Sequence, residues 1–226
     1  MNADLNRDCL AVLEKVSHFF DQRLVFKNIS LKICPGSVIM VAGPNGAGKT
    51  TLINIIAGLI SPTTGQASHN FHAREMACLG HSTFVYPGLS ALDNLRFWAG
   101  VYARPGHDRA LNELLKLVGL KTFALEKAGT FSRGMLQRLS LARVLLIKPR
   151  LMLLDEPGTG LDALSRSLLK DLIRQGTSQG MATVWISHTL EEDLEMADQV
   201  YYLDRKQVQF AGSAKNFTEW EREYRH

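Results

Sequence analysis

The sequence predicts an α/β fold in which helices cover a mostly parallel sheet and a helical segment is inserted in the middle of the chain. Three observations predict it: a short apolar run followed by a glycine-rich segment and a helix, a helical pattern in the middle, and alternating strand and helix patterns in the last third. The chain has 226 residues, of which 46% are hydrophobic and 21% charged, as expected for one domain with a full core.

The N-terminal part of the chain is expected to form short strands. Within residues 10–33, the apolar residues Ile29, Leu31 and Ile33 alternate with polar neighbours. Such alternation is typical of a sheet with one buried face. A Pro-Gly pair at positions 35–36 predicts a turn after these strands.

The chain then passes from a buried strand into a helix. Residues 37–42 (SVIMVA) form a short apolar run, which predicts a strand buried on both faces. A glycine-rich segment follows. A helix is expected from about Gly48 to Ala57, where Gly58 would end it.

A helical pattern extends from Ser90 to about Arg143. Ser90 and Asp93 have a spacing close to that of a capping box, so a helix is expected to begin there. A second apolar stripe ends at Gly119, and glycine commonly follows a helix. The middle of the chain is therefore expected to be a helical insertion in the sheet domain.

The last third alternates again. Strands are expected at 150–154 and 182–187, and helices at 162–175 and 190–197. This order indicates parallel strands joined by helical crossovers. Three aromatic residues near the end are expected to pack an amphipathic helix on the core, with a docking surface as the alternative: Phe217, Trp220 and Tyr224.

Composition and charge exclude several classes of protein. The net charge of +4 is too small to indicate nucleic-acid binding by itself. The longest uncharged stretch, 50–73, is interrupted too often to span a bilayer, and the N-terminus lacks the apolar core of a signal peptide. The cysteines Cys9, Cys34 and Cys78 have no metal-binding spacing and are expected to be free buried thiols.

The strongest chemical signal is a glycine-rich loop that ends in Lys-Thr. It matches Gly-x-x-x-x-Gly-Lys-Ser/Thr and lies between a predicted strand and a predicted helix, as this motif requires. Its backbone N–H groups and the helix N-terminus would bind phosphates. Lys49 would reach the β- and γ-phosphates, and the Thr50 hydroxyl would bind Mg²⁺. The predicted nucleotide-binding residues are Gly43, Pro44, Asn45, Gly46, Ala47, Gly48, Lys49, Thr50 and Thr51.

A second signal is an apolar strand that ends in two carboxylates. Residues 151–154 are followed by Asp155 and Glu156, and they come after the helical segment. Asp155 would lie at the edge of the sheet beside the phosphates, where it would hold Mg²⁺. Glu156 would be the general base that orients the attacking water.

A third segment, residues 131–139, precedes the carboxylate strand. By itself it indicates only a helix that begins after Ser132. Together with the other two motifs, the chain resembles the nucleotide-binding subunits of ATP-binding-cassette (ABC) transporters. In that family a signature motif opens a helix aimed at the γ-phosphate of ATP held by the other subunit. The resemblance implies this role for Ser132 and Gly134, whereas Arg133 and Met135 depart from the family's pattern.

The resemblance implies further site residues. Asp162 would lie in the D-loop that crosses the dimer interface, and His188, at the end of a strand, would contact the γ-phosphate and support catalysis. The family usually has a Gln between the glycine-rich loop and the helical segment, where it ligates Mg²⁺. Here His81 or Ser82 takes that place.

ATP and Mg²⁺ are the ligands that the resemblance implies. Phe20 falls near the aromatic residue that stacks on adenine in the family, and the adjacent Phe19 is the alternative. Thr50 and Asp155 are the implied metal-binding residues. These assignments add a base-stacking group and a cation to the phosphate site that the motifs predict.

The resemblance also implies an architecture. It is a P-loop NTPase (RecA-like) core with an N-terminal antiparallel β sub-domain and an inserted helical sub-domain. The chain would be a single ABC ATPase domain, with residues 1–80 and 142–226 in the core and β sub-domain. Residues 81–141 would form the helical sub-domain with the signature motif.

The implied function is that of an ATP-hydrolysing subunit that drives an ABC membrane transporter. Two copies, or this chain and a close relative, would sandwich two ATP molecules and act on an integral membrane subunit. The chain would be cytoplasmic, on the inner face of the cell membrane, and no nucleic acid is expected as a partner.

Within the family, Gly80, His81 and Ser82, followed by residues 89–98, resemble the haem-exporter subunit of bacterial cytochrome c maturation (CcmA-type). An exporter of lipid, peptide or drug is the first alternative. An ATP-binding subunit with little turnover, or a soluble ABC ATPase that acts on ribosomes or DNA, are the others.

Overall fold

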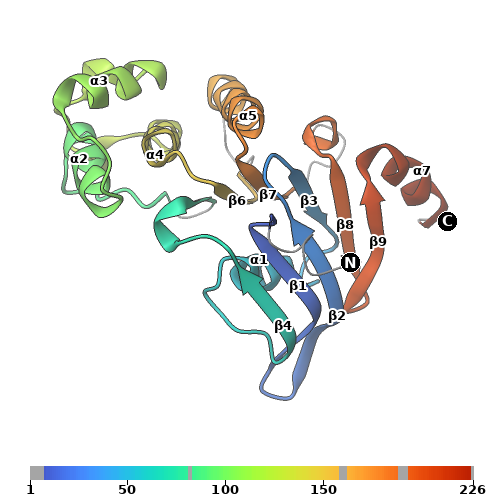
Figure 1. The fold of residues 1–226 in the computed structure, drawn as a ribbon. Helices are drawn as coiled ribbons and strands as arrows, with labels where there is room; N and C mark the ends of the chain where they lie inside the picture. The colour runs from blue at the N-terminus through green and yellow to red at the C-terminus, as the bar shows by residue number, and fades with distance from the viewer. Residues whose placement is uncertain (1–7, 81–82, 158–161, 188–192, 225–226) are drawn as a thin grey trace.

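The computed structural model describes residues 8–80, 83–157, 162–187 and 193–224, which form two sheets with helices around them (Figure 1). The smaller sheet is antiparallel, as predicted. Its strands, in spatial order, are β2 (Arg23–Ile33), β1 (Ala11–Phe20) and β4 (Thr64–His69). The sheet buries Val16, Phe26 and Ile29 completely on its inner face.

The larger sheet is mostly parallel, which confirms the predicted fold class. Its first five strands pair in parallel, and the last pairs antiparallel with its neighbour. In spatial order they are β5 (Met76–Leu79), β6 (Leu151–Asp155), β7 (Ala182–Ile186), β3 (Val38–Ala42), β8 (Gln199–Asp204) and β9 (Gln207–Ser213). Strands β4, β5, β8 and β9 were not predicted, because these segments are short or rich in polar residues.

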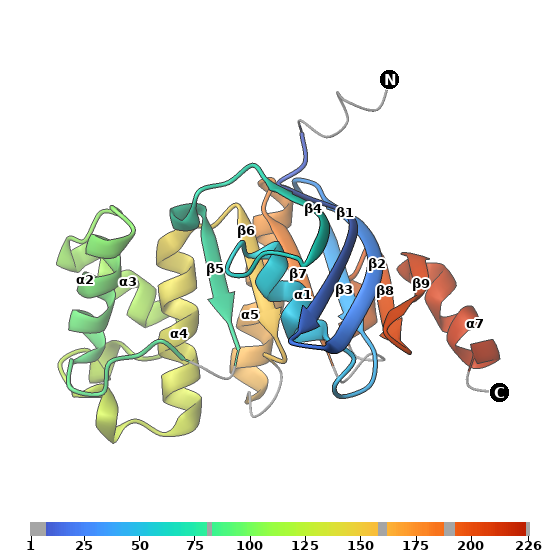
Figure 2. The same ribbon diagram turned by 90° about the horizontal axis from the view of Figure 1, so that it is seen from below.

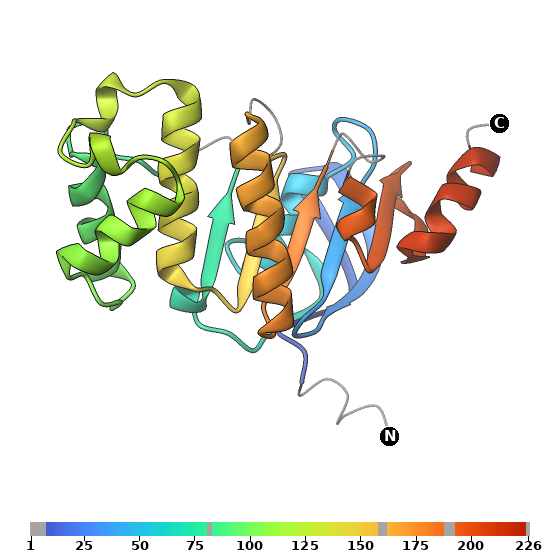
Figure 3. The ribbon, with the colours of Figure 1, turned by 90° about the horizontal axis from the view of Figure 1, so that it is seen from above.

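Both faces of the larger sheet are buried. On β6, Leu151 and Leu153 belong to the core shared with the smaller sheet and with α1 (Lys49–Ile56), whereas Met152 and Leu154 face the helices on the other side. Figures 2 and 3 show α1 between the two sheets and α5 (Ala163–Ser178) on the opposite face. The continuous apolar runs in the sequence follow from this two-sided burial.

The middle of the chain is helical, with α2 (Ala91–Val101), α3 (Asp108–Leu117) and α4 (Arg133–Ile147) packed on one another. The predicted start of α2 is confirmed, because the Ser90 hydroxyl accepts a hydrogen bond of 3.1 Å from the Asp93 N–H. In the described ranges no helix is long and apolar enough to cross a bilayer. The division into sub-domains stays a prediction, and α4 continues through its proposed boundary at 141–142.

The end of the chain packs on the sheet. Helix α7 (Ala214–Tyr224) follows β9, and Phe217 is completely buried with Met40 and Val200. The prediction that the C-terminal aromatic residues pack on the core is therefore confirmed. The helix expected at 190–197 is described only in part, and the described part is a short 3-10 helix, Leu194–Met196.

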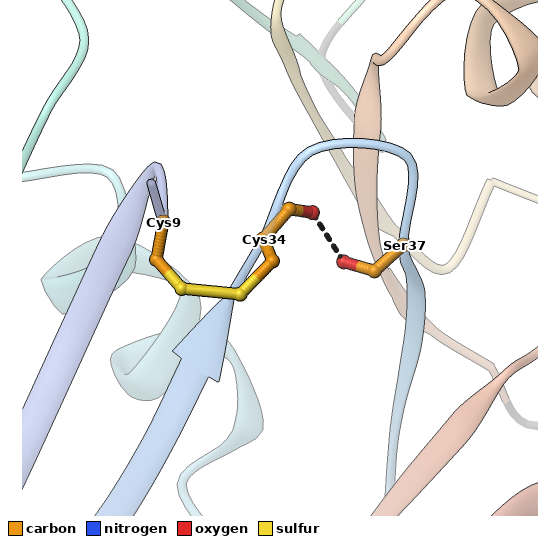
Figure 4. The surroundings of a disulfide bond; sticks show 3 residues. All are labelled: Cys9, Cys34 and Ser37. Atoms are coloured by element: carbon orange, nitrogen blue, oxygen red, sulfur yellow. Dashed lines mark hydrogen bonds between the residues drawn. A yellow bond between two sulfur atoms is a disulfide. The ribbon is translucent and has the colours of Figure 1, made fainter. Parts of the chain in front are cut away.

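The cysteine prediction was wrong for two of the three residues. Cys9 and Cys34 form a disulfide bond between the start of β1 and the end of β2 (Figure 4). The antiparallel register brings them together, because the Leu10 N–H donates to the Ile33 carbonyl at 2.7 Å. Spacing along the chain could not show this pairing. Cys78 is a free thiol, as predicted, but it is half-buried and not fully buried.

Reduction of this disulfide is expected to lower stability. The bond joins residues 25 positions apart. Closing a loop of that length lowers the conformational entropy of the unfolded chain, which stabilises the folded state by about 3 kcal/mol. Dithiothreitol should therefore lower the Tm of the wild type, measured by calorimetry, and leave that of a C9S/C34S variant unchanged. Equal shifts in both proteins would show that the bond does not contribute.

Candidate nucleotide-binding site

The glycine-rich loop connects β3 to α1 and lies very close to neighbouring backbone. A Cβ atom on Gly43 would overlap the carbonyl oxygen of Leu203, and one on Gly48 would lie 2.7 Å from the Val25 side chain. Both glycines have positive φ, at 138° and 96°. Larger residues at either position would displace the loop, so the packing itself requires glycine here.

Lys49 is the first residue of α1, and its side chain turns back into the loop. Its Nζ donates hydrogen bonds to the carbonyl oxygens of Gly43 at 2.8 Å and Pro44 at 3.0 Å. Burial lowers the pKa of Lys49, although the carboxylates of Glu156 and Asp155 act to raise it. The first turn of α1 has no acidic residue and no side-chain cap. This end of the helix therefore favours an anion.

Thr50 and Asp155 come together from α1 and β6. The Thr50 hydroxyl donates a hydrogen bond of 3.2 Å to Oδ2 of Asp155. A hydroxyl and a carboxylate are oxygen ligands of the kind that Mg²⁺ accepts alongside phosphate and water. In the described part of the chain, no group of three or more His, Cys, Asp or Glu side chains could hold a metal ion. As one hydroxyl and one carboxylate, the pair fits Mg²⁺ whose other ligands are phosphate oxygens and water.

Glu156 follows in a left-handed backbone conformation, with φ at 55°. Its N–H donates to the carbonyl oxygen of Ile186 at 3.0 Å, which holds the turn after β6. Glu156 lines a cavity of about 840 Å³ together with the glycine-rich loop, the β1–β2 turn and the β8–β9 turn. The lysine, the loop and this carboxylate therefore face one space.

The structure separates the two candidates for the stacking residue. Phe20 lines the cavity and Phe19 does not. Phe20 is 56% exposed, and its ring packs edge-on against His18, with centroids 4.9 Å apart. An exposed ring at a cavity is suited to stacking on a base. Stacking by Phe20 stays a prediction.

Ser132, Gly134 and Asp162 lie near one another and do not line the nucleotide cavity. Ser132 caps α4 by accepting a hydrogen bond from the Met135 N–H at 3.3 Å, and Asp162 caps α5 through Ser165 at 2.8 Å. A Cβ atom on Gly134 would lie 3.4 Å from Oδ2 of Asp162. Within one chain these residues are therefore not part of the wall of that cavity.

Three predicted site residues lie outside the described residues: His188, His81 and Ser82. Their neighbours are described. Gly80 follows β5, and the Ser187 hydroxyl, after β7, donates to Oδ2 of Asp193 at 2.6 Å. The roles of the three residues stay predictions.

Comparison with known proteins decides the family. The family model described as ABC transporter matches residues 26–159, more than half of the chain. This chain belongs to the ABC transporter family. The predicted family and enzyme class, an ABC-type ATPase, are confirmed. This match does not distinguish the predicted haem-exporter group from the other groups of the family.

Two relatives show how far the ABC domain extends. The ABC transporter ATP-binding protein NatA of Bacillus subtilis is 30% identical over 219 residues, which are 90% of this chain and 89% of NatA. The linearmycin resistance ATP-binding protein LnrL of the same organism is 30% identical over 207 residues, which are 86% of this chain. The chain spans only 66% of the length of LnrL.

A solved structure described as an ATP binding subunit of an ABC transporter has the same fold as this ABC domain. It superposes with a TM-score of 0.83 and covers 94% of this chain, with 25% sequence identity. The alignment covers 93% of that chain. The mixed sheet, the antiparallel sheet and the helices are thus those of an ABC ATPase domain.

Part of the cavity of this ABC domain is formed by residues that were not predicted from the sequence. Arg23 at the start of β2, Asp204 at the end of β8, and Arg205 and Lys206 in the β8–β9 turn also line it. The only signal in the sequence was the short polar stretch at residues 204–207, between the segments that form β8 and β9. Nothing in the sequence connects that stretch with the glycine-rich loop, because only the pairing of β3 with β8 brings them together.

Proposed function

We propose that this ABC domain binds and hydrolyses ATP in a composite site and thereby drives an integral membrane transporter subunit. The observation that carries the proposal is the division of the predicted residues. Lys49, Thr50 and Glu156 line one cavity, and Asp155 is hydrogen-bonded to Thr50. Ser132 and Gly134 do not line that cavity. A second copy, or a close relative, would supply the missing phosphate contacts.

The residues then have separate roles. The loop and Lys49 bind the β- and γ-phosphates, and Thr50 and Asp155 hold Mg²⁺, which neutralises phosphate charge. Glu156 orients the attacking water and accepts its proton, and His188 supports this step. The helix N-terminus after Ser132 faces the γ-phosphate of the partner's ATP. ATP thus favours the closed dimer because it binds both chains, and hydrolysis favours opening.

Mixing two inactive variants tests the composite site. A K49M chain loses its own phosphate site but keeps Ser132 and Gly134, and a G134D chain keeps its phosphate site but presents a carboxylate to the partner's γ-phosphate. Each variant alone should hydrolyse ATP at a few per cent of the wild-type rate or less, because every site contains one defect. A mixture forms some dimers with one intact site, so phosphate release should rise well above the sum of the two variants.

Wild-type chain at the same total concentration sets the upper limit for this assay, and each variant mixed with itself is the control. A mixture no more active than its components, in a protein that dimerises with ATP, would contradict the composite site.

An exposed aromatic surface supports docking to a membrane subunit. Phe84, Tyr86 and Phe97 are 46%, 44% and 41% exposed, and they surround Trp98 on α2. The buried guanidinium of Arg143 stacks beneath this surface, 4.9 Å from the Phe84 ring centroid. Contiguous exposed aromatic residues indicate an interaction site. Such docking would place the chain in the cytoplasm, on the inner face of the membrane.

The cargo proposal is haem export in cytochrome c maturation. It depends on the resemblance of residues 80–82 and 89–98 alone. The name of LnrL mentions resistance, and neither relative's name mentions haem. Purification of the intact complex from membranes, followed by identification of the co-purified transmembrane subunit, tests it. A haem-binding subunit would support it, and a lipid, peptide or drug exporter, or a ribosome, would replace it.

A further inference from the structure

Two cations occupy the β8–β9 turn in an unfavourable backbone conformation. Asp204 pairs with Gln207, so Arg205 and Lys206 form a two-residue hairpin loop. Both have positive φ, at 47° and 63°. Such loops prefer Asn-Gly, because a positive φ is energetically unfavourable for residues with larger side chains. Strain of this kind is often retained at functional positions.

The turn is held from three sides. The N–H of Lys27 on β2 donates to the Lys206 carbonyl at 2.9 Å. The Tyr224 hydroxyl of α7 donates to Oδ2 of Asp204 at 2.8 Å. On the third side, the backbone of Leu203 packs directly against Gly43 of the glycine-rich loop. The position of the turn relative to the phosphate-binding loop is therefore determined by the fold.

The turn brings positive charge to the nucleotide cavity. Arg23, Arg205 and Lys206 all line it. Among the described residues, Arg23 and Lys206 have no ion pair. Arg205 pairs with its neighbour Asp204 at 3.9 Å, and its guanidinium lies 5.9 Å from the centroid of the Tyr224 ring, with 80% of the side chain exposed. Asp204 also accepts hydrogen bonds from Tyr224 and from the Arg205 N–H at 2.7 Å. The carboxylates of Asp21 and Asp204 also line this side of the cavity, so its three cations exceed its carboxylates by one charge.

We propose that Arg205 and Lys206 form a second anion-binding element of the cavity, which attracts the phosphate chain of a nucleoside triphosphate bound to the glycine-rich loop of the same chain. Arg23 adds to the same field. A triphosphate carries several negative charges, and two cations on a fixed turn lower its free energy without ordering a mobile segment. This inference rests on the proposed ATP binding and names additional residues for it.

The test replaces the turn with the sequence that its geometry prefers. The variant R205N/K206G removes both cations and relieves the positive-φ strain, so its Tm should be unchanged or higher. A K121Q/K127Q variant loses the same charge on exposed residues away from the cavity and is the matched control. Equilibrium titration with ATP and Mg²⁺, and separately with uncharged adenosine, measures affinity at low and at physiological salt.

The affinity of R205N/K206G for ATP is expected to fall about tenfold at low salt, with a smaller loss at higher salt because exposed charges are screened. Its affinity for adenosine, and the affinity of the control for ATP, should stay within about twofold of wild type. An unchanged ATP affinity, or an equal loss for adenosine or in the control, would overturn the inference. Wild-type protein that bound no ATP would refute the proposed function itself.

Discussion

Replacement of Glu156 by Gln is expected to reduce steady-state ATP hydrolysis by a factor of about 10² to 10⁴, the usual contribution of a general base. The amide cannot accept the proton of the attacking water. ATP binding should persist, because Lys49, Thr50 and Asp155 are unchanged and one negative charge beside the phosphates is removed. ATP would then remain bound between two chains, so a dimer should accumulate in size-exclusion chromatography with ATP and Mg²⁺.

The matched control for this experiment is E126Q, the same substitution at an exposed glutamate on a different part of the surface. It should keep the wild-type rate and remain monomeric on the same column after ATP is hydrolysed. Full turnover by E156Q would show that another group is the base. Loss of turnover without an ATP-dependent dimer would separate the chemical role of Glu156 from the composite site.

Replacement of Lys49 by Met is expected to weaken ATP binding by about 10² to 10³-fold, because it removes a charged donor to the phosphates from the interior of the loop. The apolar methionine keeps the volume of the lysine stem. Burial lowers the pKa of Lys49, so the ammonium form is disfavoured in the folded chain. Its removal should therefore leave the free energy of unfolding unchanged or raise it.

Titration calorimetry with ATP and thermal unfolding without ATP measure these two effects on the same samples. K121M, at an exposed lysine, is the control and should change neither. Loss of binding with a large fall in Tm would indicate instead that the hydrogen bonds of Lys49 to Gly43 and Pro44 mainly hold the loop together.

Much of the fold was predictable because its signals are local. Strands β3, β6 and β7 are apolar runs that the sheet buries on both faces, and Ser90 caps its helix through a contact three residues away. Strand β9 was missed because its burial is only partial and no position in it is fully buried. The short strand β5 was missed because it becomes a strand only by pairing with β6.

The candidate site divides in the same way. Two short motifs contain most of the site, namely residues 43–51 and the pair Asp155 and Glu156. Residue types at fixed short spacings identify such motifs, because the local backbone within each motif positions its functional groups. Phe20, which the resemblance implied with Phe19 as the alternative, lines the cavity, whereas the presence of Arg205 and Lys206 there came only from the folded chain. No periodicity or spacing relates those residues to the phosphate loop.

Local patterns in the sequence were sufficient to predict the glycine-rich loop, the two carboxylates that follow a buried strand, the central strands β3, β6 and β7, and the family. These depend on residue types at fixed short spacings. Tertiary structure alone decided that Cys9 meets Cys34, that Ser132 and Gly134 lie outside the cavity of their own chain, and that a strained cationic turn lines it. Those facts depend on which strands pair and in what register, and many distant contacts set that pairing together.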